Sequence, residues 1–247
     1  MGKVIADLAA SAASATLSVE NATSSVNYVL SKTDGSAGEF LKTDGSGALS
    51  FASAAGGFTR LHIPSSGAYT VPAGVTKIVV EVQGAGGSSG NSTGADGSSG
   101  SGAGGYAMKS LSVTAGDAIT VAVGAVSATA AGGDSKFTSD TGAFTEVKGT
   151  GGGPGTVAVG TVDGGAGGVG SGGDLNINGQ RGSPKNANDS NMVGADSRFG
   201  SGGITRADGT TTGRTATGYG AGGSGSNQST GVGGNGSPGL VIVWEYK

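Results

Sequence analysis

The sequence contains no cysteine, and proline, aromatic and charged residues are all scarce. Without cysteine the chain forms neither disulfides nor thiolate metal sites. Charged residues make up 13% of the chain, about half of the usual ~25%, and the formal net charge is −3. This slightly acidic balance gives no basic surface for nucleic acid. No apolar run of about 18 residues occurs, so we expect no membrane insertion.

Glycine is what the chain has in excess, with 55 of 247 residues against a usual share of ~7%. Valine and isoleucine far outnumber leucine, which favours strands. The low net charge differs from that of typical disordered chains, and the absence of a strict Gly-X-Y register excludes collagen. We therefore predict an ordered all-β chain and exclude a coiled coil, a helical bundle and an ordinary α/β enzyme.

The first 53 residues have few glycines and contain some helix formers. Their apolar spacing predicts a short Ala-rich helix, and the alternative is a frayed tail. With Asp7 inside it, the stretch is a poor secretory signal. The apolar stripe consists of Ile5, Leu8, Ala9, Ala12 and Ala15.

A near-repeat with a ten-residue period follows, in which Lys32–Ser36 recurs as Lys42–Ser46. Each copy carries Asp-Gly near apolar residues, which predicts β-hairpins. We interpret residues 1–53 as an N-terminal attachment or shaft segment and residues 54–247 as one glycine-rich tip domain. The expected buried faces of the hairpins are Tyr28, Val29, Leu30, Phe40, Leu41, Leu49 and Phe51.

The tip domain contains six stretches of alternating or continuous β-branched residues, separated by turn residues. The last of them is apolar enough for a central strand, so we expect it to pair within the sheet that the earlier ones build. The glycine-rich stretch would then leave an antiparallel β-sandwich and return to it. The predicted strands are Thr59–Ile63, Ala68–Val71, Lys77–Gln83, Tyr106–Val113, Ala118–Val123 and Leu240–Tyr246.

Between these strands the glycines step by three, as in Gly164, Gly167, Gly170 and Gly173. A period of three matches the extended left-handed helix with three residues per turn. Because glycine has no Cβ, several such helices can pack closely and exchange hydrogen bonds sideways. We predict inserted, packed polyglycine II helices; flexible Gly/Ser linkers are the alternative.

Motifs for chemistry are absent. His62 is the only histidine, with no G-x-S-x-G elbow beside it, and no H-E-x-x-H or G-x-x-x-x-G-K-[ST] occurs, so we expect no enzyme, no cofactor and no resident metal. Two possibilities stay open, a structural cation and a pair of carboxylates that meet only in space. The aspartates on glycine-rich loops are Asp163, Asp174, Asp189, Asp196 and Asp208.

A family resemblance rests on several segments in order. Tyr69–Val75, then Ile78–Val82 running into Gly84–Gly87, resembles the glycine-rich C-terminal domain of bacteriophage tail fibres. The segments Gly172–Gln180 and Gly233–Val243 are similar to the centre and the end of that domain. The likeness covers residues 58–247 but departs from the pattern at 183–217. The Lys-Thr-Asp-Gly-Ser repeats also resemble segments that precede tail-fibre tips.

The resemblance implies a homotrimeric receptor-binding tip in the virion, made in the host cytoplasm, with its glycine helices intertwined or packed as a trimer. We expect an adhesin that attaches to a bacterial surface polysaccharide or outer-membrane protein, while its N-terminal segment docks on other tail or fibre proteins. Two alternatives are a trimeric spacer or cap without a ligand, and a polysaccharide-degrading enzyme. A secreted bacterial surface adhesin is a fourth hypothesis, and it needs an export route.

Receptor contacts should come from segments that interrupt the glycine platform, because loops on rigid scaffolds carry binding. The longest interruption is 178–214, and 91–96 and 218–227 are further candidates. Amides and arginines hydrogen-bond sugar hydroxyls, and aromatic rings stack on apolar faces. The alternative is that these side chains fill the core or only add solubility. The candidate residues are Arg181, Lys185, Asn186, Asn188, Asn191, Met192, Arg198, Phe199, Arg206 and Tyr219.

Overall fold

The protein is described by a computed structural model that forms two compact units, Met1–Gly57 and Phe58–Lys247. All regular elements of the described residues are strands, and no helix among them could cross a membrane. The described residues are 4–7, 16–19, 28–29, 36, 39–44, 46, 49–53, 56–92, 97–186, 192–204, 212–226 and 231–247.

The first unit begins with strands, so the predicted N-terminal helix is wrong. Strand β1 (Val4–Asp7) pairs antiparallel with β2 (Thr16–Val19), which pairs with β3 (Tyr28–Val29). A short Ala-rich helix is unstable by itself, and β-branched residues such as Val4 and Ile5 favour a strand. The rest of the predicted helical stripe lies outside the described residues: Leu8, Ala9, Ala12 and Ala15.

The second predicted hairpin of this unit is present. Strand β4 (Glu39–Thr43) pairs antiparallel with β5 (Leu49–Ser53). In the connection, the Ser46 N–H donates to Asp44 Oδ1 at 2.8 Å, a side-chain bond that stabilises turns. The first copy of the repeat lies outside the described residues, except for Ser36.

The prediction that this hairpin buries its apolar residues is wrong for the single chain. Phe40, Leu41 and Phe51 are 46%, 45% and 37% exposed, whereas Leu49 is partly buried. A two-stranded hairpin has no second layer of its own to cover a face. The side chains of Tyr28, Val29 and Leu30 fall outside what the structure describes.

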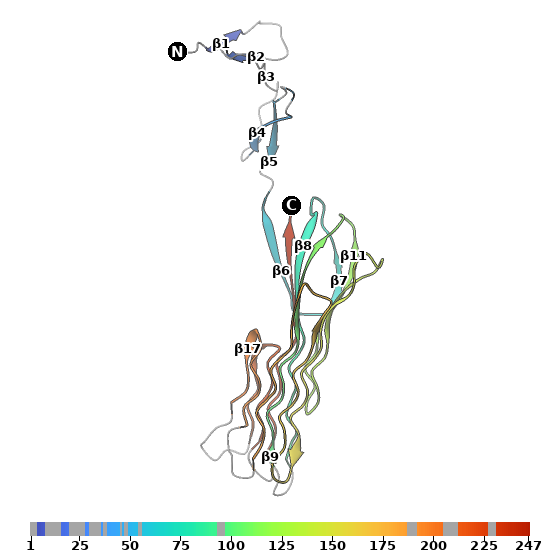
Figure 1. The fold of residues 1–247 in the computed structure, drawn as a ribbon, viewed down its shortest axis with the longest axis vertical. Helices are drawn as coiled ribbons and strands as arrows, with labels where there is room; N and C mark the ends of the chain where they lie inside the picture. Colours follow the sequence, from blue (N-terminus) through green and yellow to red (C-terminus); the bar gives the residue numbers. More distant parts are fainter. Residues whose placement is uncertain are drawn as a thin grey trace. The chain divides into compact units, whose positions relative to one another are not determined.

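The second unit contains two five-stranded antiparallel sheets in a sandwich-like arrangement (Figure 1). The first sheet has the order β16 (Leu175–Ile177), β10 (Tyr106–Ser112), β8 (Lys77–Gln83), β19 (Leu240–Tyr246), β6 (Phe58–Ile63). The second has the order β15 (Gly170–Ser171), β13 (Val147–Gly149), β12 (Ser135–Ser139), β11 (Ala118–Ala122), β7 (Gly67–Thr70).

The C-terminal strand lies inside the first sheet, as predicted. Strand β19 pairs with β8 on one side and β6 on the other. One hydrophobic cluster joins the inner faces of the two sheets, with Val80 and Val243 from the first and Val121 and Phe137 from the second. Each of these four side chains is at most 2% exposed. The glycine-rich stretch therefore leaves and rejoins one common core.

The glycine-rich segments extend from the sheets toward the end marked by β9 (Gly97–Ser98), which pairs with β14 (Val157–Ala158) (Figure 1). Every backbone N–H from Ser99 to Gly105 donates to a carbonyl of another segment, at 2.8 to 3.0 Å. The acceptors alternate among three neighbours. Ser99, Gly102 and Gly105 donate to 150–156, Gly100 and Ala103 to 180–183, and Ser101 and Gly104 to 220–223.

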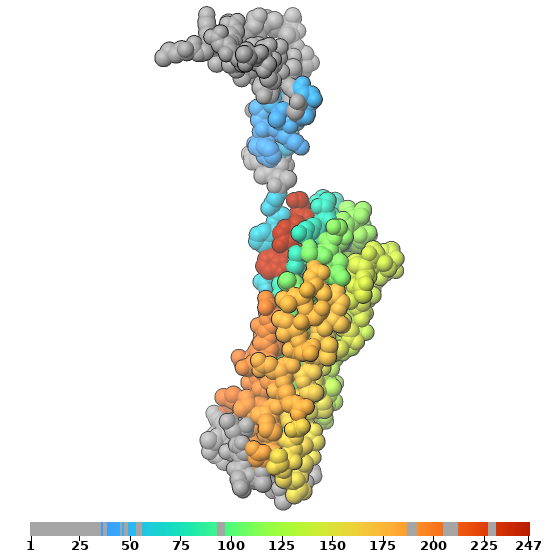
Figure 2. All heavy atoms as spheres, viewed as in Figure 1, coloured from blue at the N-terminus to red at the C-terminus, as the bar shows by residue number. Residues whose placement is uncertain are grey.

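A second segment repeats this arrangement with other partners. Gly84 and Gly87 donate to Gly105 and Gly102, whereas the two residues after each donate to 130–133 and 234–237. Segments far apart in the sequence therefore lie side by side, as the space-filling view shows for part of the bundle (Figure 2). In this bundle the described segments bond to one another within one chain.

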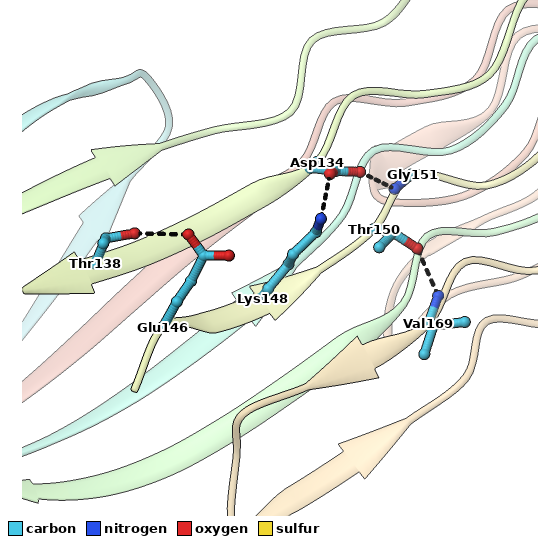
Figure 3. Close-up of polar contacts among 7 residues, drawn as sticks. All are labelled: Asp134, Thr138, Glu146, Lys148, Thr150, Gly151 and Val169. Carbon is cyan, nitrogen blue, oxygen red and sulfur yellow. Dashed lines mark hydrogen bonds and ion pairs between the residues drawn. The ribbon is translucent and has the colours of Figure 1, made fainter. Parts of the chain in front are cut away.

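Where the strands of the second sheet continue into the bundle, side-chain hydrogen bonds link neighbouring segments (Figure 3). The Asp134 carboxylate accepts from Lys148 Nζ at 2.7 Å and from the Gly151 N–H at 3.1 Å. The Val169 N–H donates to Thr150 Oγ1 at 2.7 Å. These bonds hold three segment starts in register.

Candidate functional site

A pocket of about 340 Å³ lies on the outer side of the first sheet, next to the glycine segments. This volume is at the lower end of the range of ligand sites, ~300–1,000 Å³. Strands β8 and β10 contribute Gln83 and Tyr106, and the segments after β16 and before β17 (Phe199–Ser201) contribute most of the rest. The described residues that line it are Gln83, Gly104, Tyr106, Ile177, Asn178, Gly179, Gln180, Asp196, Ser197 and Arg198.

A buried carboxylate organises the sheet beside the pocket. Glu81 is 9% exposed; its oxygens accept from Tyr106 Oη at 2.8 Å and from Trp244 Nε1 at 2.9 Å. Arg198 Nε lies 3.7 Å from the same carboxylate. Burial, followed by the Glu81 hydrogen bond and charge, raises the pKa of Tyr106, so its hydroxyl remains a donor. The buried charge is thus paired on several sides, as buried charges require.

Arg198 joins this cluster to a hairpin that covers part of the sheet. Its guanidinium lies 4.8 Å from the ring centroid of Tyr106 and 5.6 Å from that of Phe199, a cation–π geometry. Strand β17 pairs with β18 (Thr217–Tyr219), which places Tyr219 opposite Phe199. The Tyr219 ring meets His62 edge-on at 5.3 Å. The sheet face therefore positions the hairpin and, through it, Arg198.

The pocket wall keeps polar groups free. Asn178 and Gln180 are exposed, and among the described residues their side chains have no hydrogen-bond partner. Asp196 uses Oδ1 to accept from the Gly202 N–H at 2.7 Å. Within the described ranges, no group of three or more His, Cys, Asp or Glu could hold a metal ion. The arrangement can form hydrogen bonds with a small polar ligand.

The predicted receptor residues separate into four sets, of which the first three are as follows. Arg198, Phe199 and Tyr219 come together on the outer face of the first sheet. Asn186 is exposed, and so is Arg181, whose Nη1 lies 2.8 Å from Asp163 Oδ2. Three predicted residues lie outside the described part of the chain: Asn188, Asn191 and Arg206.

Two predicted receptor residues are part of the bundle instead. Met192 is fully buried and Lys185 is 8% exposed. Lys185 Nζ donates to the Gly160 carbonyl at 2.9 Å, and its backbone pairs with Val162. Part of the interruption therefore supports the bundle, because neighbouring glycine segments enclose these two side chains.

Sequence reasoning missed Glu81 and Gln83 as parts of the site. Both occur in a strand that reads as central, which predicts a core role for its side chains. The available signal was the change from apolar residues to Gln83 directly before the glycine run.

A comparison with protein families matches residues 63–246 to a family model described as a glycine-rich domain. The match covers most of the second unit and well over half of the chain. No curated protein is similar enough to match. The chain therefore belongs to the glycine-rich domain family.

Proposed function

We propose that this protein is an adhesin at the tip of a bacteriophage tail fibre, which attaches the virion to a bacterial surface receptor. The resemblance of residues 58–247 to such tips motivates the proposal, and membership of the glycine-rich domain family is consistent with it. The observation that carries it is the cross-bonded bundle, which presents the exposed residues of the interruption, Arg181 and Asn186 among them.

The bundle supports this role because it is a stiff platform. We infer that its segments are polyglycine II helices, since hydrogen-bond partners return every third residue along Ser99–Gly105 and Gly84–Ser89. Consecutive amides bonded to three neighbours leave little backbone freedom. Contacts on such a platform bind without first ordering a loop, which lowers the entropic cost of attachment.

The protein also acts as a homotrimer in this proposal. The bundle bonds within one chain, so we assign trimer contacts to the N-terminal unit. There the β4–β5 hairpin leaves Leu41 and Phe51 exposed on one face. Three linked sites would turn weak single contacts into strong attachment by avidity. The same unit would dock on other tail or fibre proteins.

A structural spacer or cap without a ligand is the second candidate. The burial of Lys185 and Met192 favours it, because these interrupting residues support the bundle. An enzyme that degrades polysaccharide has less support. Glycoside hydrolysis uses two carboxylates across a groove, and of the described residues that line the pocket only Asp196 carries one.

Binding of the labelled full-length protein to a panel of intact bacterial strains tests the proposal. We expect saturable binding to some strains and none to others. The variant Arg181→Ala/Asn186→Ala should weaken binding if the interruption contacts the receptor. Replacing the whole interruption is unsuitable, because Gly182 and Gly194 lie against other backbones of the bundle. A correctly assembled protein that binds no strain would favour the spacer.

A further inference from the structure

We propose that the pocket beside Arg198 binds a neutral sugar residue. This inference rests on the proposed attachment function and assigns the ligand class to one site of that protein. The pocket is separate from the exposed residues Arg181 and Asn186 of the interruption, because neither lines it. Three independent features of its wall support the assignment: free amides, an unpaired buried oxygen and the balance of charge.

The free amides match the chemistry of a sugar. Asn178 and Gln180 line the pocket, and among the described residues neither side chain has a hydrogen-bond partner. An amide offers two donors and an acceptor, and every sugar hydroxyl both donates and accepts. Two amides on one wall can therefore pair with adjacent hydroxyls. Ile177, which is 42% exposed on the same wall, offers an apolar contact for the C–H face of a ring.

Gln83 adds a buried acceptor that lacks a partner. Its side chain is 1% exposed, and Nε2 donates to the Gly104 carbonyl at 2.9 Å. This bond fixes the amide orientation and leaves Oε1 as the one buried side-chain polar atom without a hydrogen bond among the described residues. Buried oxygens normally have a donor. Because Gln83 lines the pocket, a small shift of its wall would let a ligand hydroxyl supply that donor.

The charges near the pocket disfavour an acidic ligand. Of the described residues that line the pocket only Arg198 is cationic, and Glu81 lies 3.7 Å from its Nε. Asp196 adds a second carboxylate, with Oδ1 bonded to Gly202 and Oδ2 left without a partner among the described residues. The lining and the adjacent Glu81 thus carry one guanidinium and two carboxylates, and this negative balance disfavours a uronic acid or a phosphate. A neutral hexose or N-acetylhexosamine avoids this cost.

The test is a calorimetric titration of the full-length protein with methyl glycosides of neutral hexoses and N-acetylhexosamines, and with methyl glucuronide as the acidic counterpart. We expect weak, saturable binding of at least one neutral sugar and none of the glucuronide. Asn178→Ala/Gln180→Ala should bind about tenfold more weakly, the loss expected for two hydrogen bonds. The matched control is Asn235→Ala, which removes an exposed amide outside the pocket.

A charge variant gives a second readout. Asp196→Asn keeps the acceptor for Gly202 and removes one negative charge, so it should admit the glucuronide while neutral-sugar binding changes little. No binding by any neutral sugar would overturn the inference. Binding that is equally strong in Asn178→Ala/Gln180→Ala would also overturn it, because the sugar would then occupy another site.

Different results would disprove the sugar pocket and the attachment function. If the protein binds cells, but the sugar does not compete and the pocket variants bind normally, the inference is wrong and attachment stands. If the pocket binds sugar but the trimer binds no cells, attachment is wrong and the pocket stands. Thermal unfolding of each variant checks that folding is unchanged.

Discussion

Backbone packing at single glycines decides whether the bundle forms. A Cβ built on Gly167 would meet the carbonyl oxygen of Gly179, and one on Gly86 would meet that of Ala221. Both neighbours are backbone atoms of cross-bonded segments, so they cannot rotate away as a side chain would. The period of three in the sequence thus has a steric cause, since the glycines face other backbones.

Gly167→Ala should destabilise the protein by about 1–3 kcal/mol, the usual cost of overpacking a tight interior. Gly67→Ala is the matched control, because a Cβ there meets nothing within 4 Å. Thermal unfolding of the three proteins measures the difference. Equal stability of the two variants would contradict close packing at Gly167.

The Asp134–Lys148 pair predicts a dependence of stability on pH. Burial raises the pKa of Asp134, but the hydrogen bonds from Lys148 and Gly151 outweigh burial and hold it below its ordinary value of about 3.8. The Asp134 hydrogen bond raises the pKa of Lys148, against a smaller effect of burial. Stability from Asp134 is present above its unfolded pKa and decreases as pH falls through its folded pKa. Stability from Lys148 is lost only in alkali, as pH rises through its folded pKa.

The free energy of unfolding should therefore decrease in wild-type protein as the pH falls below about 4, and less steeply in Asp134→Asn. The effect is small, because the Asp134 side chain is 36% exposed. Asp163→Asn is the control, since that carboxylate is 82% exposed. Parallel pH profiles for wild type and Asp134→Asn, from chemical denaturation, would refute the account.

The predicted receptor residues show which side-chain positions could be predicted from the sequence. Arg198, Phe199 and Tyr219 were selected as polar or aromatic exceptions in a glycine-rich region, and they do meet in space. Lys185 and Met192 were also selected as residues that interrupt the glycines, but they are buried. Composition marks which side chains interrupt the bundle, but their direction depends on which segments lie beside them. Which segments lie there is decided by the tertiary structure, and local sequence does not reveal it.

Among the elements, long apolar strands were predictable and short ones were not. The limits of β8 and β19 match the prediction, because β-branched residues fill both strands. Strands β17 and β18 have three residues each with a central glycine, so no pattern marks them. The N-terminal helix failed because a three- to four-residue apolar spacing in an Ala-rich stretch is too weak to outweigh strand pairing.

The β17–β18 hairpin should depend on Phe199. Its ring is partly buried, 6.0 Å from the ring of Tyr106. Phe199→Ala should increase amide exchange in β17 and β18 severalfold while β8 and β19 remain protected, because regions with fewer buried contacts open more readily. Phe58→Ala, in strand β6 of the first sheet, is the control, since Phe58 is 60% exposed. Unchanged exchange in the hairpin would show that Phe199 does not anchor it.

For the whole molecule, the hydrogen bonds of the bundle bear on how the proposed trimer would assemble. Sequence reasoning predicted packed glycine helices, intertwined or packed as a trimer, but it did not say which subunit faces meet. The hydrogen bonds join 99–105 to three segments of the same chain. These bonds of the bundle therefore need no second chain, and in the proposed trimer the contacts between subunits would come from other surfaces.

Light scattering of the full-length protein should give a mass of three chains. Leu41→Ser/Phe51→Ser should shift it toward one chain, because the two residues lie opposite each other on one exposed face. Phe40→Ser is the control, since it lies on the other face of the hairpin. A wild-type monomer would exclude the trimeric fibre, and a trimeric double variant would place the interface elsewhere.

The measurement that tests the account most directly is residue-resolved amide hydrogen exchange of the full-length protein across 99–105. An edge strand would protect alternate amides, whereas this segment donates from every one of its seven consecutive residues to three different neighbours. We predict slow exchange at all seven, comparable to that of the central strand β8. Fast exchange throughout would mean that the glycine-rich stretch is a flexible linker, and it would remove the rigid platform on which the proposed attachment depends.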